Sequence, residues 1–212
     1  MMRWVVLALA VGARAQVGVP LKPAAGAKPI AVRDKRYGVR FEVPAGWTFG
    51  RKDHQVSTFH LDARSAARKA ELRGVASMDF NPFPASTFSG GLFYFSVLRH
   101  ANDNSCARQA HGAARDLVDV GGMSFRHGHD ETREACVVLR DEVYTAYRRG
   151  SCYRFDLVVT TFCGETVGVR EMTEDELSSV REGLGGILDS VVLDWGGRGG
   201  GKVEVGGRRV SP

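Results

Sequence analysis

Two histidines separated by a single residue are the candidate for metal chemistry in this sequence. They are His127 and His129, in the segment His127-Gly128-His129-Asp130-Glu131. Alternate residues of a strand lie on the same face, so both imidazoles could bind one metal ion. A metal-dependent hydrolase that uses them is one hypothesis. The other is a polar strand edge that runs into a turn.

The wider pattern around these histidines favours the polar strand edge. The segment resembles the H-x-H-x-D-H motif of metallo-β-lactamase-like hydrolases, which would need Asp at position 131 and His at position 132. The chain has Glu131 and Thr132 there, and no partner ligands are evident elsewhere in the sequence. We therefore expect no metal and no cofactor.

Nucleophilic catalysis is not indicated either. Ser, His and Asp are present, but the G-x-S-x-G nucleophile elbow is absent. Asp156 lies within an apolar segment with Arg154 two residues away, on the same face of a strand. A buried carboxylate can be an acid with a perturbed pKa, but a structural ion pair is the favoured interpretation. We expect no catalytic residue, and we favour a protein that is not an enzyme over one that is, although the sequence leaves both open.

An aromatic-rich stretch runs through the middle of the chain. It contains Phe80, Phe83, Phe88, Phe93, Tyr94 and Phe95, together with Pro82 and Pro84. Such a stretch can form a ligand groove or an exposed binding surface. Packing in the core and in a loop is the interpretation that we favour.

The beginning of the sequence has the pattern of an export signal. Arg3 precedes the apolar run Trp4 to Val11, and Ala13-Arg14-Ala15 forms an A-x-A cleavage site before Gln16. The run is shorter than the roughly 20 apolar residues of a membrane span, so we expect no stable span. The sequence predicts a protein exported to the periplasm or out of the cell.

Charge does not indicate a nucleic-acid partner. The net charge is +5 over 212 residues, and the mature chain after Ala15 loses Arg3 and Arg14. The remaining charges are mixed along the chain, and an exported protein does not meet nucleic acid in the cytoplasm. We expect an unknown protein or envelope component as the partner.

Four cysteines, an even number, favour disulfides in an exported chain. They are Cys106, Cys136, Cys152 and Cys163. Free buried thiols are the alternative, and a zinc site is disfavoured because no C-x-x-C pair exists.

The spacing of these cysteines along two predicted strands favours one pairing. Cys152 and Cys163 lie at opposite ends of one strand, about 35 Å apart at the usual rise, whereas a disulfide needs Cα atoms within about 7 Å. A two-residue turn at Arg149-Gly150 places Cys136 opposite Cys163, which leaves Cys106 for Cys152. A bulge would instead place Cys136 and Cys163 on opposite faces.

Strands predominate in the predicted order of elements, and helices are inserted singly. The predicted strands are 37–43, 56–61, 75–80, 92–98, 123–129, 136–147 and 152–163, and the predicted helices are 64–73, 104 or 105 to 118, and one that begins at Thr173. Thr173 and Glu176 form a capping box at the last helix, which carries an apolar face from Leu177 to Val191. These elements predict an α+β fold with a central, mainly antiparallel sheet flanked by helices.

The composition divides the chain into four parts. They are a signal peptide (1–15), a flexible leader rich in Pro, Ala and Gly (16–34), a single domain (35–195) and a glycine-rich tail (196–212) that we expect to be disordered.

Two parts of the domain resemble a known group of folds. The segment Tyr37 to Trp47, a strand followed by Pro-Ala-Gly-Trp, resembles the opening of PsbP-like and Mog1-like domains. The end is also similar: a strand, an amphipathic helix and the short apolar segment Ile187 to Val192. The resemblance implies an α/β/α sandwich. Members of this group are mostly binding or assembly factors without a shared catalytic set. We therefore expect an exported, non-catalytic binding or accessory domain stabilised by disulfides.

Overall fold

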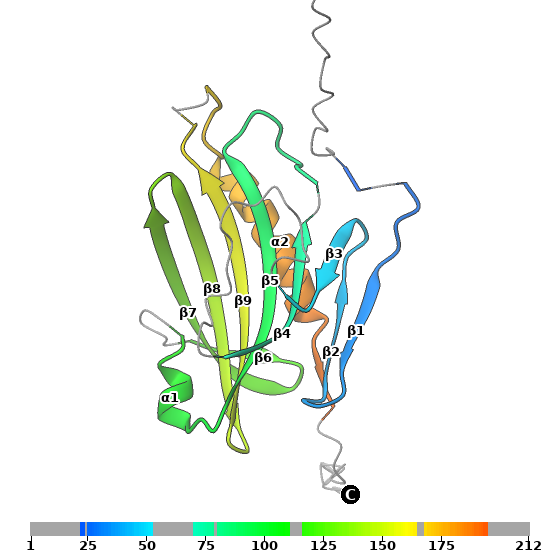
Figure 1. Ribbon diagram of the computed structural model, residues 1–212, viewed down its shortest axis with the longest axis vertical. Helices are drawn as coiled ribbons and strands as arrows, with labels where there is room; N and C mark the ends of the chain where they lie inside the picture. The colour runs from blue at the N-terminus through cyan, green and yellow to red at the C-terminus, as the bar shows by residue number, and fades with distance from the viewer. Residues whose placement is uncertain are drawn as a thin grey trace, which may run out of the picture.

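The structure is a computed structural model in which ten strands and two helices are described (Figure 1). It describes residues 22–23, 25–52, 70–78, 80–110, 116–164 and 168–194. The elements are β1 (Ile30–Asp34), β2 (Val39–Val43), β3 (Trp47–Gly50), β4 (Glu71–Met78), β5 (Phe88–Arg99), α1 (Asp103–Ala107), β6 (Asp116–Val120), β7 (Met123–Glu134), β8 (Val137–Arg148), β9 (Ser151–Phe162), α2 (Glu174–Asp189) and β10 (Val192–Leu193).

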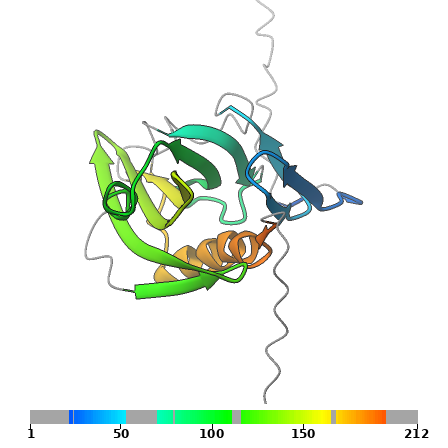
Figure 2. The same ribbon diagram turned by 90° about the horizontal axis from the view of Figure 1, so that it is seen from below.

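Two antiparallel sheets carry the fold. The larger has seven strands in the order β3-β4-β5-β9-β8-β7-β6, and the smaller has the order β1-β2-β10. The larger sheet curves around α2, which lies along one of its faces (Figure 2). This arrangement confirms the predicted α+β class and the mainly antiparallel sheet.

The β8–β9 hairpin has the register that its turn predicts. Arg148 lies opposite Ser151, Tyr144 opposite Phe155 and Ala146 opposite Tyr153. Arg149 and Gly150 both have positive φ angles, 45° and 77°, as a two-residue type I′ turn requires. The register continues without a bulge to the far end of both strands.

The helix α2 begins where its capping box predicts. The Thr173 side chain accepts a hydrogen bond from the Glu176 backbone, and the Glu176 side chain accepts one from the Thr173 backbone. Hydrogen bonds from Arg170 lower the pKa of Glu176 to about 2, so this carboxylate is ionised at any physiological pH.

The main core lies between α2, one face of the larger sheet and the smaller sheet. Leu184 and Ile187 of α2 are fully buried against strand residues such as Phe93 and Phe155, whose rings stack at 5.7 Å. A smaller apolar cluster occupies the other face of the larger sheet and consists of Val75, Leu92, Tyr94 and Val158.

Three predicted elements differ from the structure. The last five residues of the predicted flexible leader form β1, because Val32 buries its side chain against the core and the strand pairs with β2. The helix expected from residue 104 or 105 to 118 ends at Ala107, and its N-cap is Asn102. Residues 116–118 belong to β6, whose pairing with β7 overrides the local helical pattern. Residues 71–73, expected to end a helix, begin β4.

Some sequence-based expectations lie outside the described residues. These are the signal peptide (1–15), residues 16–21 and 24 of the leader, the strand 56–61, the first six residues of the helix 64–73, residues 111–115 of the helix expected to end at 118, and the tail 196–212. Within the described segments, neither helix has the length and apolar character needed to cross a membrane.

Candidate functional site

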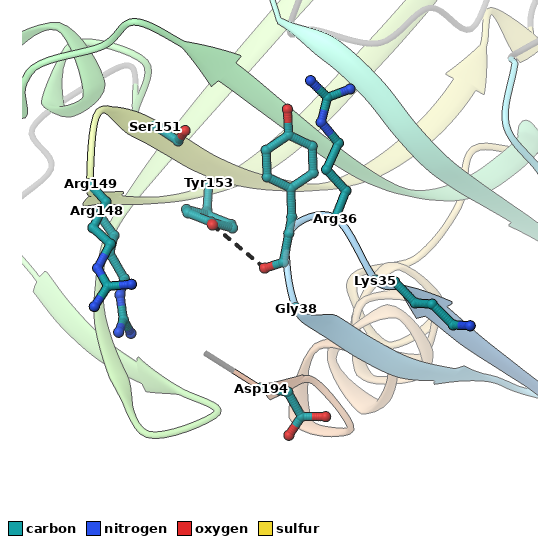
Figure 3. A pocket seen from close by; sticks show the side chains of 9 residues that line it. Lys35, Arg36, Gly38, Arg148, Arg149, Ser151, Tyr153 and Asp194 are labelled. Atoms are coloured by element: carbon teal, nitrogen blue, oxygen red, sulfur yellow. Dashed lines mark hydrogen bonds between the residues drawn. The ribbon is translucent and has the colours of Figure 1, made fainter. Parts of the chain in front are cut away.

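A pocket lies at the end of the molecule where the β1–β2 turn faces the β8–β9 turn. Its volume is about 320 Å³. The lining residues are Lys35, Arg36, Tyr37 and Gly38 of the first turn, Arg148, Arg149, Ser151 and Tyr153 of the hairpin, and Asp194 after β10 (Figure 3). We call this the basic pocket, because four of its nine lining residues are cationic.

The β1–β2 wall of the basic pocket is shaped by a turn with its own hydrogen bonds. The buried Asp34 carboxylate accepts hydrogen bonds from the backbone N–H groups of Arg36 and Tyr37 at 3.0 and 3.1 Å. Gly38 follows with φ of +64°, and a Cβ there would lie 2.1 Å from the Asp194 carbonyl oxygen. Only glycine therefore lets Asp194 approach this turn so closely.

The hairpin wall is held in place from outside. The backbone N–H of Ala101 donates to the Gly150 carbonyl at 3.0 Å. Cys152, next to Ser151, forms a disulfide with Cys106 of α1. Both contacts fix the tip of a long hairpin, and with it Arg148 and Arg149, relative to the rest of the domain.

Two tyrosines form the interior of the pocket. The rings of Tyr37 and Tyr153 meet edge to face at 6.0 Å, and the Tyr153 hydroxyl donates to the Tyr37 carbonyl oxygen at 3.5 Å (Figure 3). Burial raises the pKa of both phenols above the ordinary value, and for Tyr37 the charge of Glu71 adds to the effect. The pocket interior is therefore uncharged up to strongly alkaline pH.

The single carboxylate in the pocket lining is already neutralised. Asp194 pairs with Arg40 through two contacts, Nε to Oδ2 at 2.6 Å and Nη2 to Oδ1 at 3.1 Å. Arg36 has an acidic neighbour, Glu71, at 3.7 Å, but Arg73 binds the same carboxylate more closely at 2.6 Å. For Glu71, burial acts to raise the pKa, but the hydrogen bond from Arg73 and the nearby guanidinium groups outweigh it and lower the pKa.

Positive charge thus accumulates at this end of the fold. The pocket lining and the ion pairs linked to it include the cationic side chains Lys35, Arg36, Arg40, Arg51, Arg73, Arg99, Arg148 and Arg149, and the carboxylates of Asp34, Glu71 and Asp194. A pocket whose charged lining residues are mainly cationic attracts anions.

The structure places the two candidate metal ligands elsewhere, on β7. Both imidazoles contact one carboxylate that the sequence did not single out: His127 Nε2 lies 2.6 Å from Glu142 Oε2, and His129 Nδ1 lies 3.0 Å from Glu142 Oε1. The His127 ring also stacks on Tyr144, with ring centroids 4.6 Å apart. Each imidazole has a nitrogen engaged by the carboxylate. Within the part of the chain that the structure describes, no three His, Cys, Asp or Glu side chains gather as metal ligands would.

The pair Arg154 and Asp156 is a buried ion pair on the face of the sheet opposite α2. The Arg154 Nη2 group lies 2.5 Å from Asp156 Oδ1, and both side chains are almost fully buried. Arg154 also donates to the Gln109 carbonyl oxygen at 2.9 Å, which joins the segment after α1 to the sheet. A second buried carboxyl group, Asp141, lies 3.8 Å from Arg154. These contacts support the interpretation of Arg154 and Asp156 as a structural ion pair.

The aromatic stretch is mostly core. Phe88, Phe93 and Phe95 are buried within the main core, and Tyr94 is buried on the opposite face of the sheet. Phe80 and Phe83 are partly buried against the main core. These described rings therefore form no exposed aromatic surface.

The structure contains two disulfides, Cys106–Cys152 and Cys136–Cys163, the pairs that the hairpin register favours. They fit an oxidising compartment.

The basic pocket was not predicted from the sequence. The sequence feature that could have indicated this pocket is a pair of basic residues at each of two turns. The pairs are Lys35-Arg36 and Arg148-Arg149, and they lie more than 100 residues apart.

Comparison with known proteins gives structural neighbours but no sequence family. No family model matches the chain, and no curated protein matches it significantly. The chain resembles LpqN, which is involved in cell envelope biogenesis of Mycobacterium tuberculosis, at 11% identity and a TM-score of 0.43, covering 80% of this chain and 92% of that one. It also resembles PsbP (CyanoP) from the cyanobacterium Synechocystis, at 12% identity and a TM-score of 0.39, covering 86% and 98% of the two chains.

A third similar structure is a protein of Bacteroides thetaiotaomicron, at 10% identity and a TM-score of 0.39. The match covers 74% of this chain but only 45% of the Bacteroides chain, so this chain spans less than half of that protein. A PsbP protein is thus among the structures to which this chain is similar.

Proposed function

We propose that this protein is an exported, non-catalytic binding domain that recognises an anionic group of an envelope component or partner through the basic pocket. The observation that carries the proposal is that Lys35, Arg36, Arg148 and Arg149 line one pocket whose single carboxylate is already paired with Arg40. Arginine and lysine placed in this way bind phosphate and carboxylate groups.

The proposed place of action is the periplasm or the outside of the cell. Two disulfides support it, because such bonds persist in oxidising compartments. The signal-peptide pattern gives a specific expectation: protein recovered from the periplasm or medium of an expressing bacterium begins at Gln16. Intact-mass spectrometry measures this directly. Full-length protein retained in the cytoplasm would contradict the export proposal.

Charge reversal in the hairpin wall tests the binding proposal. We expect the double variant Arg148→Glu/Arg149→Glu to lose at least tenfold in affinity for inorganic pyrophosphate, because two attractive charges become repulsive ones. Isothermal titration calorimetry at low salt measures the affinity.

The matched control is Arg133→Glu/Arg181→Glu, which changes the net charge by the same amount at residues outside the pocket. This control should lose less than threefold. Equal losses in both variants would mean that only overall charge matters, and absence of binding by the unaltered protein would remove the proposal.

A further inference from the structure

The two disulfides of this protein differ in their access to solvent. Cys106 is 1% exposed and Cys152 is 0% exposed, whereas Cys136 and Cys163 are both partly exposed. Cys106 lies in α1, which packs against β8 and β9, and Cys152 lies in β9 between its neighbours β5 and β8. A reagent dissolved in water therefore meets Cys136–Cys163 at the surface, but it meets Cys106–Cys152 only after part of the fold opens.

The position of Cys136 accounts for its exposure. β7 ends at Glu134 and β8 begins at Val137, so Cys136 lies in a two-residue turn beside the exposed Ala135. Cys163 directly follows β9, at the same end of the sheet as this turn and at the opposite end from α1 (Figure 1). The disulfide thus joins the tip of one hairpin to the end of the next strand at the surface of the domain.

We infer that Cys136–Cys163 is a site of reversible thiol–disulfide exchange, which a dithiol opens while the protein stays folded. Cys106–Cys152 stays closed as a structural link. The physical basis is access, because an attacking thiolate must reach a sulfur atom, and exposed disulfides are the labile ones. The inference does not depend on the basic pocket, which lies at the other end of β8 and β9.

Opening this disulfide leaves the backbone contacts around it in place. The backbone N–H of Cys163 donates to the Cys136 carbonyl oxygen at 3.0 Å, and this hydrogen bond involves neither sulfur. The β8–β9 ladder runs from Val137 to Arg148, and the β7–β8 ladder continues up to the turn. These contacts keep the two Cα atoms near their separation of 5.2 Å, which lies within the range that a disulfide requires. The two thiols therefore stay adjacent, and oxidation forms the same bond again.

The exchange transfers two electrons from the dithiol to the protein in two steps. First, a thiolate of the dithiol attacks one sulfur of Cys136–Cys163, the S–S bond breaks, and a mixed disulfide forms. The other cysteine leaves as a thiolate and takes up a proton from water. Second, the remaining thiol of the reagent loses its proton and attacks the reagent's own sulfur in the mixed disulfide, which releases the second cysteine. The dithiol is oxidised to a disulfide, and the protein gains two thiols.

Differential alkylation of the native protein tests the inference. The unaltered protein is incubated with dithiothreitol without denaturant, samples are quenched with iodoacetamide, and peptide mass spectrometry locates the alkylated cysteines. We expect alkylation at Cys136 and Cys163 at least tenfold faster than at Cys106 and Cys152, with an unchanged far-ultraviolet circular dichroism spectrum. Equal rates, faster opening of Cys106–Cys152, or loss of the spectrum as Cys136–Cys163 opens would each overturn the inference.

Urea at concentrations below the unfolding transition shows whether each disulfide opens from the folded state. A bond that is attacked directly should open at a rate that changes less than twofold, whereas a bond reached only through unfolding opens faster as urea favours the unfolded chain. We expect the first behaviour for Cys136–Cys163 and the second for Cys106–Cys152. A parallel rise in both rates would show that the exposed disulfide also needs unfolding, which contradicts the inference.

The double variant Cys136→Ala/Cys163→Ala tests whether burial protects the other disulfide. Its remaining bond, Cys106–Cys152, should open at least tenfold more slowly than Cys136–Cys163 does in the unaltered protein, and circular dichroism verifies that the variant is folded. Opening at an equal rate in the folded variant would mean that burial gives no protection, and the inference would fail.

Reversibility is measured on reduced protein that has not been alkylated. After removal of dithiothreitol, oxidised glutathione should restore the Cys136–Cys163 pair, as peptide mapping without reduction detects. Thiols that stay open, or that pair with Cys106 or Cys152 instead, would contradict a reversible site.

Discussion

Replacing Arg154 with methionine is expected to lower the free energy of unfolding by about 3–5 kcal/mol. Arg154 is 2% exposed, and it is the closest cation to two buried carboxyl groups, Asp156 at 2.5 Å and Asp141 at 3.8 Å. Methionine fills a similar volume but leaves Asp156 as a buried charge without its partner. It also removes the hydrogen bond to the Gln109 carbonyl.

Urea unfolding followed by circular dichroism measures this loss, which is a large part of the 5–15 kcal/mol that stabilises a typical domain. The matched control is Arg126→Met, which removes a surface ion pair with Asp103. The Arg126 side chain is 40% exposed and the Asp103 side chain 60%. We expect the control to cost less than about 1 kcal/mol. Similar losses in both variants would show that the buried pair contributes no more than a surface contact.

The pH dependence of folding stability gives a second test of the same buried cluster. Burial, and then the charge of Asp156, raise the pKa of Asp141 well above its ordinary value. The folded state therefore retains a proton that the unfolded chain releases above about pH 4, and stability from this group is lost as pH rises through the raised pKa.

Asp141→Asn removes this dependence, because the amide stays neutral in both states. The variant should be more stable than the unaltered protein at pH 8, and the difference should vanish below about pH 4. Unfolding curves at both pH values measure it. A difference that does not change with pH would contradict this account of Asp141.

Removing the disulfide Cys106–Cys152 should cost about 4 kcal/mol, from the entropy of closing a loop of 46 residues in the unfolded chain. The double variant Cys106→Ala/Cys152→Ala should also bind pyrophosphate more weakly. The reason is that Cys152 lies beside Ser151 and helps hold the hairpin wall of the basic pocket.

Cys136→Ala/Cys163→Ala is the matched control. This disulfide closes a loop of 27 residues, so its removal should cost a comparable amount, about 3.5 kcal/mol. It lies at the other end of β8 and β9, so anion affinity should not change while the variant is folded. Stability is measured by urea unfolding and affinity by calorimetry below the unfolding transition. Equal effects of the two removals on affinity would contradict the proposed role of Cys106–Cys152.

Local chemistry explains which elements could be predicted from the sequence. The capping box at Thr173 identified α2, and the Arg149-Gly150 turn determined a register that runs the length of two strands. Because that register has no bulge, the disulfide pairs followed from it. In each case a few neighbouring residues carried the information.

The features that were missed depend on contacts distant in sequence. The strand β1 lies in a Pro- and Ala-rich segment and becomes a strand by pairing with β2. Glu142 contacts His127 and His129 from the adjacent strand, which no local motif indicates. The basic pocket combines two turns that lie more than 100 residues apart, and only the fold brings Lys35 and Arg149 to one site.

Titration of isotope-labelled protein with pyrophosphate, followed by backbone amide NMR, tests the central claim most directly. If pyrophosphate binds in the basic pocket, the amide chemical-shift changes saturate at one pyrophosphate per protein. They are then largest in two segments, residues 35–38 and 148–153. Amides at the far end of β8, such as Val137, should not shift. Shifts that are absent, or that scatter over exposed lysines and arginines without saturation, would contradict the claim that this pocket is the binding site.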